Sequence, residues 1–178
     1  MLIIVGPSAS GKTEVVKMII KKYNMKKLVT YTTRNMRVGE VDGIDYHFIS
    51  HESFLKKVKE QFFVETVYYN QFYYGTSYND LTNDKIVILE PTGLKHYLQL
   101  NDKHIRVCFL ECPKKVRQAR MIKRGDNLDV INSRLSRDDE IFNQDVAKLA
   151  HWVINSSDIT IDKLADDIYT LYRNSLKE

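Results

Sequence analysis

The sequence predicts an α/β fold with a parallel central sheet, and three observations support this prediction. Apolar runs alternate with amphipathic segments along most of the 178 residues. The first run, residues 2–5, leads directly into a loop bounded by glycines, and an apolar-periodic segment follows that loop. A chain of this length with 43% hydrophobic residues can bury one sizeable core and still carry inserted lobes.

The loop between residues 6 and 13 reads G-x-x-x-x-G-K-T, the pattern of a phosphate-binding loop, and a chance glycine-rich loop rarely lies between a strand and a helix. Gly6 and Gly11 let successive backbone N–H groups converge on anionic oxygens. Lys12 supplies positive charge to the β and γ phosphates of a nucleotide, and the Thr13 hydroxyl can join the shell of a Mg²⁺ ion. We therefore expect the whole loop to bind ATP: Gly6, Pro7, Ser8, Ala9, Ser10, Gly11, Lys12 and Thr13.

The core elements follow from periodicity and from strand-like apolar runs. A helix is expected over 13–23, where its N-terminus faces the bound phosphates, and a second strand over 27–31. The closing helix, 161–174, has Leu164, Ile168 and Leu171 on one face. Between them we expect strands at 85–89, 106–110 and 152–154, and helices at 92–100, 114–123 and 128–149, the last long enough to bend.

The pattern changes between residues 34 and 72, where we expect a small lobe inserted after the second strand. A turn marked by glycines at 39–43 precedes a short strand, a helix and two aromatic-rich strands. Alternating Tyr and Phe residues are typical of a packed sheet face, the role expected of most of this aromatic cluster. The expected elements are 45–49, 52–61, 62–69 and 71–74, and the cluster includes Phe62, Phe63, Tyr68, Phe72 and Tyr73.

Net charge, the length of the apolar runs and the cysteine content indicate which partners and which cellular compartment to expect. The net charge of +4 is modest and the charges are interspersed, which favours phosphorylated small molecules over nucleic acid. No apolar run is long enough for a membrane span, and no signal peptide precedes the first strand, so a cytoplasmic location is expected. Cys108 and Cys112 are expected to be reduced thiols in a core, because a metal site would need more ligands than His104 offers.

The stretch from Thr30 to Phe48 contains the pattern R-x-x-R-x-G-E-x-D-G-x-D-Y-x-F, which together with the G-P-S-x-x-G-K loop resembles the guanylate kinase family. The resemblance covers essentially the whole chain, weakly in the C-terminal helix. It implies a P-loop NTPase three-layer fold with a parallel central sheet in a single domain, 1–178. The implied parts are a core at 1–32 and 75–178, a lobe binding the nucleoside monophosphate at 33–74, and a small lid at 120–138.

Arg34 and Arg37 lie in one loop, where two guanidinium forks can clamp a phosphate that carries about two negative charges. The phenol of Tyr46 can add a neutral donor. The resemblance implies that these three residues, with Tyr74 of the Tyr73-Tyr-Gly75 match, hold the acceptor phosphate. Without the resemblance, solvation at the surface would be the preferred interpretation of two arginines in a polar loop.

Selection of the base is expected from Glu65, Thr76, Thr30 and Glu90. A carboxylate accepts hydrogen bonds from guanine N1–H and N2–H₂, whereas adenine has an unprotonated N1 there. The resemblance places Glu65 on the guanine-reading glutamate of the family and the two threonines on its base-side hydroxyls. The alternative for Glu65 is a solvated outward position between Val64 and Val67.

The segment Ile88-Leu-Glu-Pro-Thr-Gly93 departs from the family pattern, which has an acidic residue, a spacer, an aspartate and a Gln-Gly pair. Ile88 lacks the first acid, Glu90 replaces the aspartate, and Pro91 is unexpected. The departure leaves the surroundings of Mg²⁺ and the guanine specificity less secure than the kinase activity.

The resemblance also implies a lid whose arginines close over the transferring phosphates: Arg120, Arg124 and Arg134. The first two are one helical turn apart and therefore share a face. Arg117 and Arg137 are expected to be solvated, with Arg137 near Asp138, Asp139 or Glu140 on a surface rather than in a metal site. Asn155 matches a position near the adenine of ATP.

The sequence thus predicts a phosphotransferase that uses ATP and Mg²⁺ to convert GMP or dGMP to the diphosphate. Lys12, Arg34 and the lid arginines would carry the catalysis. One alternative keeps the kinase but changes the acceptor, to a modified deoxynucleotide or a phosphorylated sugar. Another is a binding module that has lost catalysis, which the intact loop disfavours. The partners expected are nucleotides, with neither nucleic acid nor membrane, and the chain would be a monomer or a homodimer.

Overall fold

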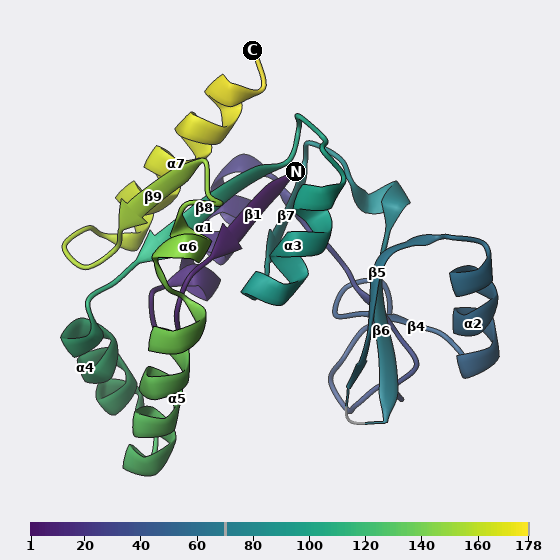
Figure 1. Cartoon of the computed structure of the whole chain (residues 1–178), viewed down its shortest axis with the longest axis horizontal. Helices are drawn as coiled ribbons and strands as arrows, with labels where there is room; N and C mark the ends of the chain where they lie inside the picture. The colour runs from purple at the N-terminus through teal and green to yellow at the C-terminus, as the bar shows by residue number, and fades with distance from the viewer. Residues whose placement is uncertain (70, 178) are drawn as a thin grey trace.

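A five-stranded parallel sheet forms the centre of the computed structural model, which describes residues 1–69 and 71–177 (Figure 1). Ile4 of the first strand aligns with Ile88 on one side and Cys108 on the other. All four residues of that strand are buried, as expected for the centre of a parallel sheet covered on both faces. The predicted α/β fold is confirmed. The strand order is β2 (Lys26–Lys27), β7 (Lys85–Ile88), β1 (Leu2–Val5), β8 (Arg106–Glu111), β9 (Trp152–Asn155).

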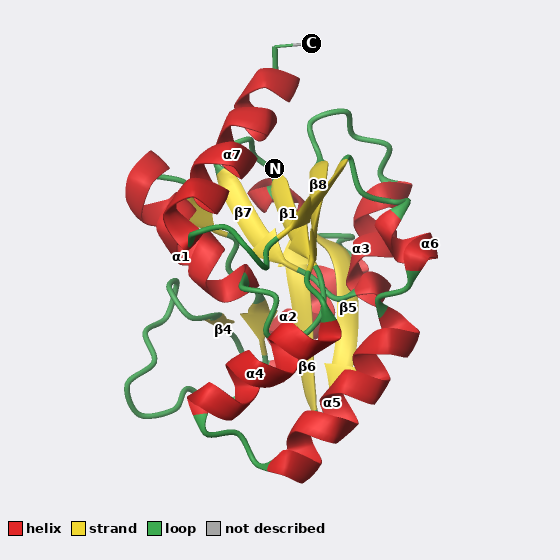
Figure 2. Cartoon of the chain, turned by 90° about the vertical axis from the view of Figure 1, so that its left-hand side faces the viewer, coloured by secondary structure: helices red, strands yellow, loops and turns green. Residues whose placement is uncertain are grey.

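Helices cover both faces of this sheet, which gives three layers. On one face, α1 (Lys12–Tyr23) and α7 (Ile161–Ser175) pack against Leu2 and Ile4. On the other, α3 (Pro91–Gln99) and α6 (Gln144–Ala147) pack against the alternate side chains, including Ile3. Figure 2 shows helices on both sides of the strands of this sheet. Because side chains alternate along β1, this one strand contributes to two separate hydrophobic clusters.

Two helices differ from the sequence prediction. The expected helix 128–149 is two helices, α5 (Leu128–Ile141) and α6, because the Asn143 side chain accepts hydrogen bonds from Asp145 and Val146 N–H and starts a new helix. In α7 the buried aromatic residue is Tyr172, whose hydroxyl donates to the Asn83 carbonyl, while Leu171 is 37% exposed. Helix α4 (Lys114–Arg124), which precedes α5, ends at Gly125. This residue has the left-handed conformation that glycine favours.

A second, four-stranded sheet forms the lobe on the right of Figure 1. It combines β4 (His47–Phe48), β3 (Tyr31–Thr32), β6 (Phe72–Ser77) and β5 (Phe63–Tyr69), followed by a short 3₁₀ turn, Tyr78–Asp80. Helix α2 (His51–Lys59) covers one face, where Phe54 stacks on Phe63 with ring centroids 4.5 Å apart. Phe54 and Phe63 are buried in the core of the lobe, as expected for Phe63, whereas Tyr68, expected in the same packed cluster, is 62% exposed.

The strand expected at 27–31 is divided between the two sheets. Lys26 and Lys27 pair with β7, whereas Tyr31 and Thr32 pair with β4 and β6. Leu28 and Val29 between them are buried, so the apolar run reads continuously in the sequence although the chain passes from one sheet to the other. The expected strand 71–74 extends to Ser77. The expected domain reaches residue 178, which lies outside the described residues, as does residue 70 of the expected lobe.

Both cysteines are buried and unpaired with each other, as predicted for thiols in a core. Burial raises the pKa of the Cys108 thiol to about 12, which keeps it protonated and unreactive at neutral pH. Within the described residues, no helix has the length and apolar character that crossing a membrane requires.

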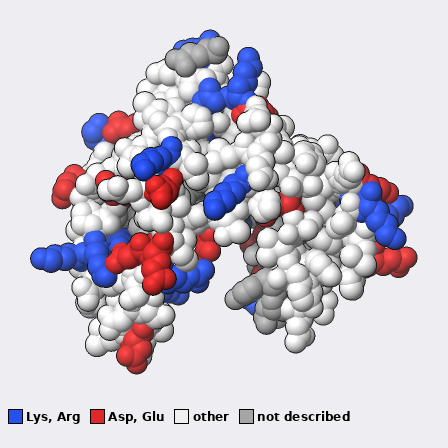
Figure 3. Space-filling model, in the orientation of Figure 1, with Lys and Arg blue, Asp and Glu red and all other residues white. Residues whose placement is uncertain are grey.

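A notch separates the arm formed by α4 and α5 from the lobe that carries β5 and β6 (Figures 1 and 3). The loop after β1 lies at the carboxyl end of the central strand, where the strand order reverses between β7 and β8. In open α/β sheets, ligands bind at this switch point. The fold therefore predicts a ligand site formed by the loop, the arm of α4 and α5, and the lobe that carries β5 and β6.

Candidate active site

The glycine-bounded loop joins β1 to α1 and is held in a conformation that few side chains permit. Gly6 has φ +152°, Gly11 φ +96° and Ala9 φ +60°. The Lys12 Nζ donates hydrogen bonds to the Gly6 carbonyl at 2.5 Å and the Pro7 carbonyl at 2.7 Å. Lysine thus folds back over its own loop, in reach of any anion held by the loop amides.

Gly6 is also the position where a side chain is least tolerable. A Cβ atom there would lie 2.5 Å from the Leu110 carbonyl oxygen, a backbone atom of β8 that has little freedom to move. We expect Gly6→Ala to lower the free energy of unfolding by about 1–3 kcal/mol and to weaken ATP binding. Thermal unfolding and calorimetric titration with ATP measure the two effects.

Gly93→Ala is the matched control, because its new Cβ would meet only the Leu89 side chain, at ordinary contact distances of 3.7 Å and above. This glycine lies inside α3, where alanine is favoured by about 0.5–1 kcal/mol. An alanine at Gly6 that leaves the melting temperature and the ATP affinity unchanged would contradict the described loop geometry.

A cavity of about 270 Å³ opens beside the loop and contains the groups that a nucleotide phosphate chain needs. Lys12 and Thr13 line it from α1, and Arg120 and Arg124 line it from α4. Burial lowers the pKa of Lys12 to about 8, with the nearby Asp138 carboxylate acting in the opposite direction. The site concentrates positive charge at the N-terminus of a helix, which is suited to an anion.

The three arginines expected in the lid differ in how they are held. Arg120 donates to the Ala9 carbonyl at 3.1 Å and to the Ser156 carbonyl at 2.7 Å, so it is fixed against the loop. Arg124 and Arg134 both pair with Asp126, in the connection between α4 and α5. Arg134 lines a different cavity, also of about 270 Å³, on the Ser8 side of the loop. The structure therefore brings two of the three into one cavity with Lys12.

Across the notch, the lobe assembles a second cationic group around Arg34. Its guanidinium is only 9% exposed, donates to the Glu40 carboxylate at 2.6 Å, and lies over the rings of Tyr46 and Phe48. The Tyr46 and Tyr74 rings are 6.0 Å apart. Glu40 raises the pKa of Arg34, with a smaller contribution from Tyr74, so this arginine is permanently charged.

Arg37 is exposed, and its backbone is fixed to Glu40 twice: its N–H donates to the Glu40 carboxylate at 2.7 Å, and its carbonyl accepts from the Glu40 N–H at 3.1 Å. The Glu40 carboxylate therefore organises both arginine positions of the loop. Sequence reasoning did not single out this residue, although it is the glutamate of the R-x-G-E pattern. The sequence does contain a signal for Glu40, an acidic residue three positions after Arg37 in a turn. An acid at this spacing can accept a hydrogen bond from the backbone N–H of the arginine, as Glu40 does.

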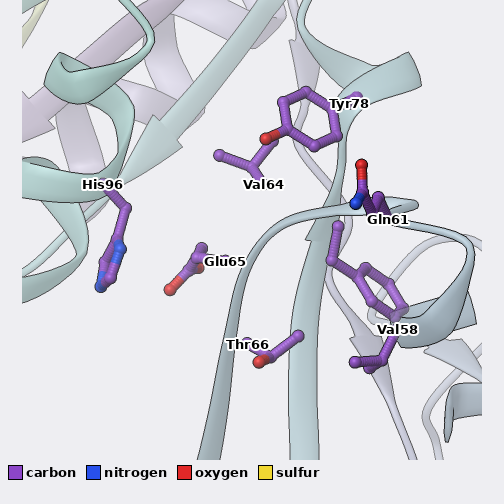
Figure 4. A pocket seen from close by; sticks show the side chains of 8 residues that line it. Val58, Gln61, Val64, Glu65, Thr66, Tyr78 and His96 are labelled. Atoms are coloured by element: carbon purple, nitrogen blue, oxygen red, sulfur yellow. The ribbon is translucent and has the colours of Figure 1, made fainter.

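Glu65 and Thr76 meet on neighbouring strands of the lobe. The Thr76 hydroxyl lies 3.4 Å from Glu65 Oε1, and the two residues are directly paired in the ladder between β5 and β6. Glu65 lines a cavity of about 520 Å³, with His96 of α3 opposite and Tyr78 at one side (Figure 4). Burial raises the pKa of the Glu65 carboxyl. Glu65 is therefore not the solvated outward residue of the alternative interpretation.

The other two residues expected to select the base lie elsewhere in this structure. Thr30 lines a cavity of about 320 Å³ that also contains Thr13, Tyr46 and Ile88. Glu90 precedes α3 and pairs with Arg137 of α5 at 3.2 Å. Pro91, unexpected from the family pattern, occupies the first turn of α3, where proline is favoured.

Arg137 is solvated as expected, with its side chain 65% exposed, but its partner is Glu90 rather than Asp138, Asp139 or Glu140. Arg117 is not solvated: it is 4% exposed and pairs with Asp138 and Asp139. Asp138 is 6% exposed, so it is not a surface residue, and it accepts a hydrogen bond from the Ser8 N–H of the loop.

Asn155 lies at the end of β9 and is exposed, with its side-chain oxygen accepting from the Ser157 N–H at 2.8 Å. It does not line the cavity that holds Lys12. Its neighbour Ser156 does contact the loop, because its hydroxyl donates to the Ser10 carbonyl at 2.8 Å. The segment after β9 is thus fixed beside the loop, with Asn155 at its outer side.

The comparisons with known proteins agree with this geometry. The family model described as Guanylate kinase matches residues 1–168. The guanylate kinase of Chlorobaculum tepidum is 32% identical over 147 residues, which are 77% of this chain and 75% of that protein. That of Bdellovibrio bacteriovorus is 43% identical over 82 residues, and the match spans only 46% of this chain and 44% of that relative.

A solved structure, the guanylate kinase from Anaplasma phagocytophilum, superposes with a TM-score of 0.64 at 20% identity, covering 98% of this chain and 84% of that one. At this identity the likeness supports the fold, while the family model and the relatives carry the classification. This chain belongs to the guanylate kinase family.

Proposed function

We propose that the protein transfers the γ-phosphoryl group of ATP to GMP or dGMP. The observation that carries the proposal is the pair of cationic groups on either side of one notch: Lys12 with the loop amides, and Arg34 with Tyr46 and Tyr74. Phosphoryl transfer needs mainly positioning and charge stabilisation, so two anion sites facing one gap are suited to it. The names of the relatives support the same activity.

On the donor side, the amides of the loop and Lys12 would hold the β and γ phosphates of ATP. Arg120 and Arg124, which share that cavity, would stabilise charge on the transferring group. Arg134 would join them after its ion pair with Asp126, a half-exposed guanidinium 3.4 Å from a carboxylate that is 17% exposed, is exchanged for contact with phosphate.

On the acceptor side, Arg34 and Arg37 would hold the phosphate of the monophosphate with the Tyr46 and Tyr74 hydroxyls, and Glu65 with Thr76 would bind the base. Burial of Glu65 favours a ligand that brings its own donors, as guanine does with N1–H and N2–H₂. An open notch separates the arm from the lobe (Figures 1 and 3), so the lobe would close toward the lid before transfer and exclude water.

The donor set fits Mg²⁺ bound chiefly through substrate phosphates. Thr13 offers one hydroxyl in the cavity beside Lys12, and no group of three acidic, histidine or cysteine ligands is found among residues 1–69 and 71–177. Mg²⁺ commonly takes one or two protein oxygens and completes its shell with phosphate and water. Bound there, the ion would neutralise charge on the phosphate chain, while the residues of the chain orient it.

A coupled assay of ADP release across nucleoside monophosphates tests the proposal. We expect turnover with GMP, dGMP or both, little with AMP, CMP and UMP, and loss of the signal when Mg²⁺ is chelated. The absence of turnover with every guanine monophosphate would reject the proposed function. Turnover with a modified deoxynucleotide or sugar phosphate instead would identify the alternative acceptor, which no feature described above favours.

A further inference from the structure

A buried carboxylate is attached directly to the phosphate-binding loop. Asp138 of α5 accepts the Ser8 N–H at 2.8 Å through its Oδ2 atom. The same oxygen accepts from Arg117 at 3.2 Å, and the two side chains are 8% and 5% exposed. A loop built to bind phosphate has therefore committed one of its amides to a group of the protein itself.

Such a carboxylate would repel a nucleotide phosphate unless its charge were neutralised in place. Arg117 provides the neutralisation, and its Nε atom donates to the Cys112 carbonyl at 3.1 Å, just after β8. Its third donor binds Asp139 at 2.9 Å. A buried ion pair of this kind is weak evidence for a gain in stability, because desolvation offsets most of the attraction. The Arg117–Asp138 pair is better explained by a role in fixing the position of the loop relative to the helices.

The pair joins the loop to the end of β8 and to both helices of the arm. Arg117 precedes Arg120 by one turn of α4, and Arg134 precedes Asp138 by one turn of α5. The position of the arm arginines relative to the loop is thus set through one hydrogen bond to Ser8. The Ser10 N–H donates to the Pro7 carbonyl at 3.3 Å, so the amides of Ala9 and of residues 11–13 are the ones that would meet the donor phosphates.

We infer that Asp138 is a positioning residue for the donor phosphates, acting through the Ser8 N–H to fix both the loop and the arm that carries Arg120, Arg124 and Arg134. The inference rests on the proposed function and goes further, because it assigns a role to a residue outside the expected substrate contacts. In this role Asp138 acts through the loop rather than through contact with the substrate.

Two double variants test whether Asp138 positions the loop by accepting the Ser8 N–H or serves only to neutralise the charge of Arg117. Arg117→Met with Asp138→Asn removes both charges and keeps an oxygen that can accept the Ser8 N–H. Arg117→Met with Asp138→Leu removes both charges and the acceptor. Asp139→Asn is the control, since it changes the exposed partner of Arg117 without touching the loop. Steady-state kinetics are measured with ATP and GMP varied in turn, together with thermal unfolding.

We expect the asparagine form to recover most of the activity, and the leucine form to lose about 10²-fold in kcat/KM for ATP, as for a misplacement of about 1 Å. The KM for GMP should stay near the wild-type value in both, and so should the activity of the control. Equal activity of the two double variants, whether high or low, would overturn the inference. If the leucine form does not fold, Asp138→Ala replaces it, and failure of both to fold would assign Asp138 a structural role instead.

Failure of the proposed function and failure of the Asp138 inference would give different experimental results. A wild-type protein inactive with all guanine monophosphates rejects that function, yet calorimetric titration of the same variants with ATP and Mg²⁺ still tests Asp138. The asparagine form should then bind ATP about as tightly as the wild type, and the leucine form more weakly. The same affinity in both forms would reject the role of Asp138 alone.

Discussion

Replacing Lys12 with methionine is expected to lower kcat/KM for ATP by about 10³-fold, equivalent to about 4 kcal/mol of transition-state stabilisation. Methionine keeps most of the length of the side chain and removes the charge. In the structure, the Lys12 ammonium lies against the Gly6 and Pro7 carbonyls, beside the cavity that also holds Arg120 and Arg124. The coupled assay of ADP release measures the loss.

Lys17→Met is the matched control, because Lys17 belongs to the same helix, its side chain is 69% exposed, and its only ion pair is with Glu14 among the residues that the structure describes. We expect it to retain wild-type turnover. If Lys12→Met were as active as Lys17→Met, the loop could not be the donor site.

Replacing Glu65 with alanine is expected to abolish the preference for guanine. A site built around a hydrogen bond can reject an analogue that lacks the group by about 10⁴ to 10⁵, so removal of the acceptor should cost a large part of kcat/KM for GMP. Thr76 remains beside position 65, but it is 2% exposed and offers no anionic acceptor to N1–H and N2–H₂. The measurement is kcat/KM for GMP and for AMP in the wild type and the variant.

Glu60→Gln provides the control, since Glu60 lies just after α2 of the same lobe and its side chain is 54% exposed. Glu60→Gln should leave kcat/KM for GMP and kcat/KM for AMP unchanged. A Glu65→Ala variant that keeps full activity with GMP would favour the alternative acceptor, for which this carboxylate is not needed.

The sequence predicted the core of the molecule well because local pattern and tertiary role coincide there. Residues 2–5 are apolar throughout, and burial on both faces of a parallel sheet demands that pattern. The loop motif likewise depends on glycines whose conformation is local. The parallel sheet and the helices that flank it were therefore predictable without knowledge of long-range contacts.

The boundaries that failed depend on partners distant in the sequence. Nothing local distinguishes Lys27 from Tyr31, yet Lys27 pairs with Ile86 of β7, 59 positions away, and Tyr31 pairs with Gly75 of β6, 44 positions away. Strand pairing of this kind needs the whole fold to be known. The break between α5 and α6 is the exception, because the Asn143 side chain caps α6 through the nearby Asp145 and Val146 N–H groups, a local feature that asparagine favours.

The candidate site shows the same division. Glu65 and Thr76 are directly opposite each other in the antiparallel ladder of β5 and β6, whereas the sequence assigned both to the base only through the family resemblance. The pairs of Arg117 with Asp138 and of Arg137 with Glu90 join segments 21 and 47 positions apart, and a charge pattern alone assigns such residues to solvent. The buried carboxylate beside the loop was therefore invisible before the structure.

The central claim is that the loop and the lobe grip two nucleotides whose phosphates meet in the notch. A crystal structure with a bisubstrate analogue, adenosine and guanosine joined by five phosphates, tests it most directly. We predict Lys12 and the loop amides on the adenosine side of that chain, and Arg34, Tyr46 and Tyr74 on its guanosine side, with the notch closed. A complex in which the Arg34 group stays remote from the phosphates, with the guanosine outside the lobe, would contradict the account.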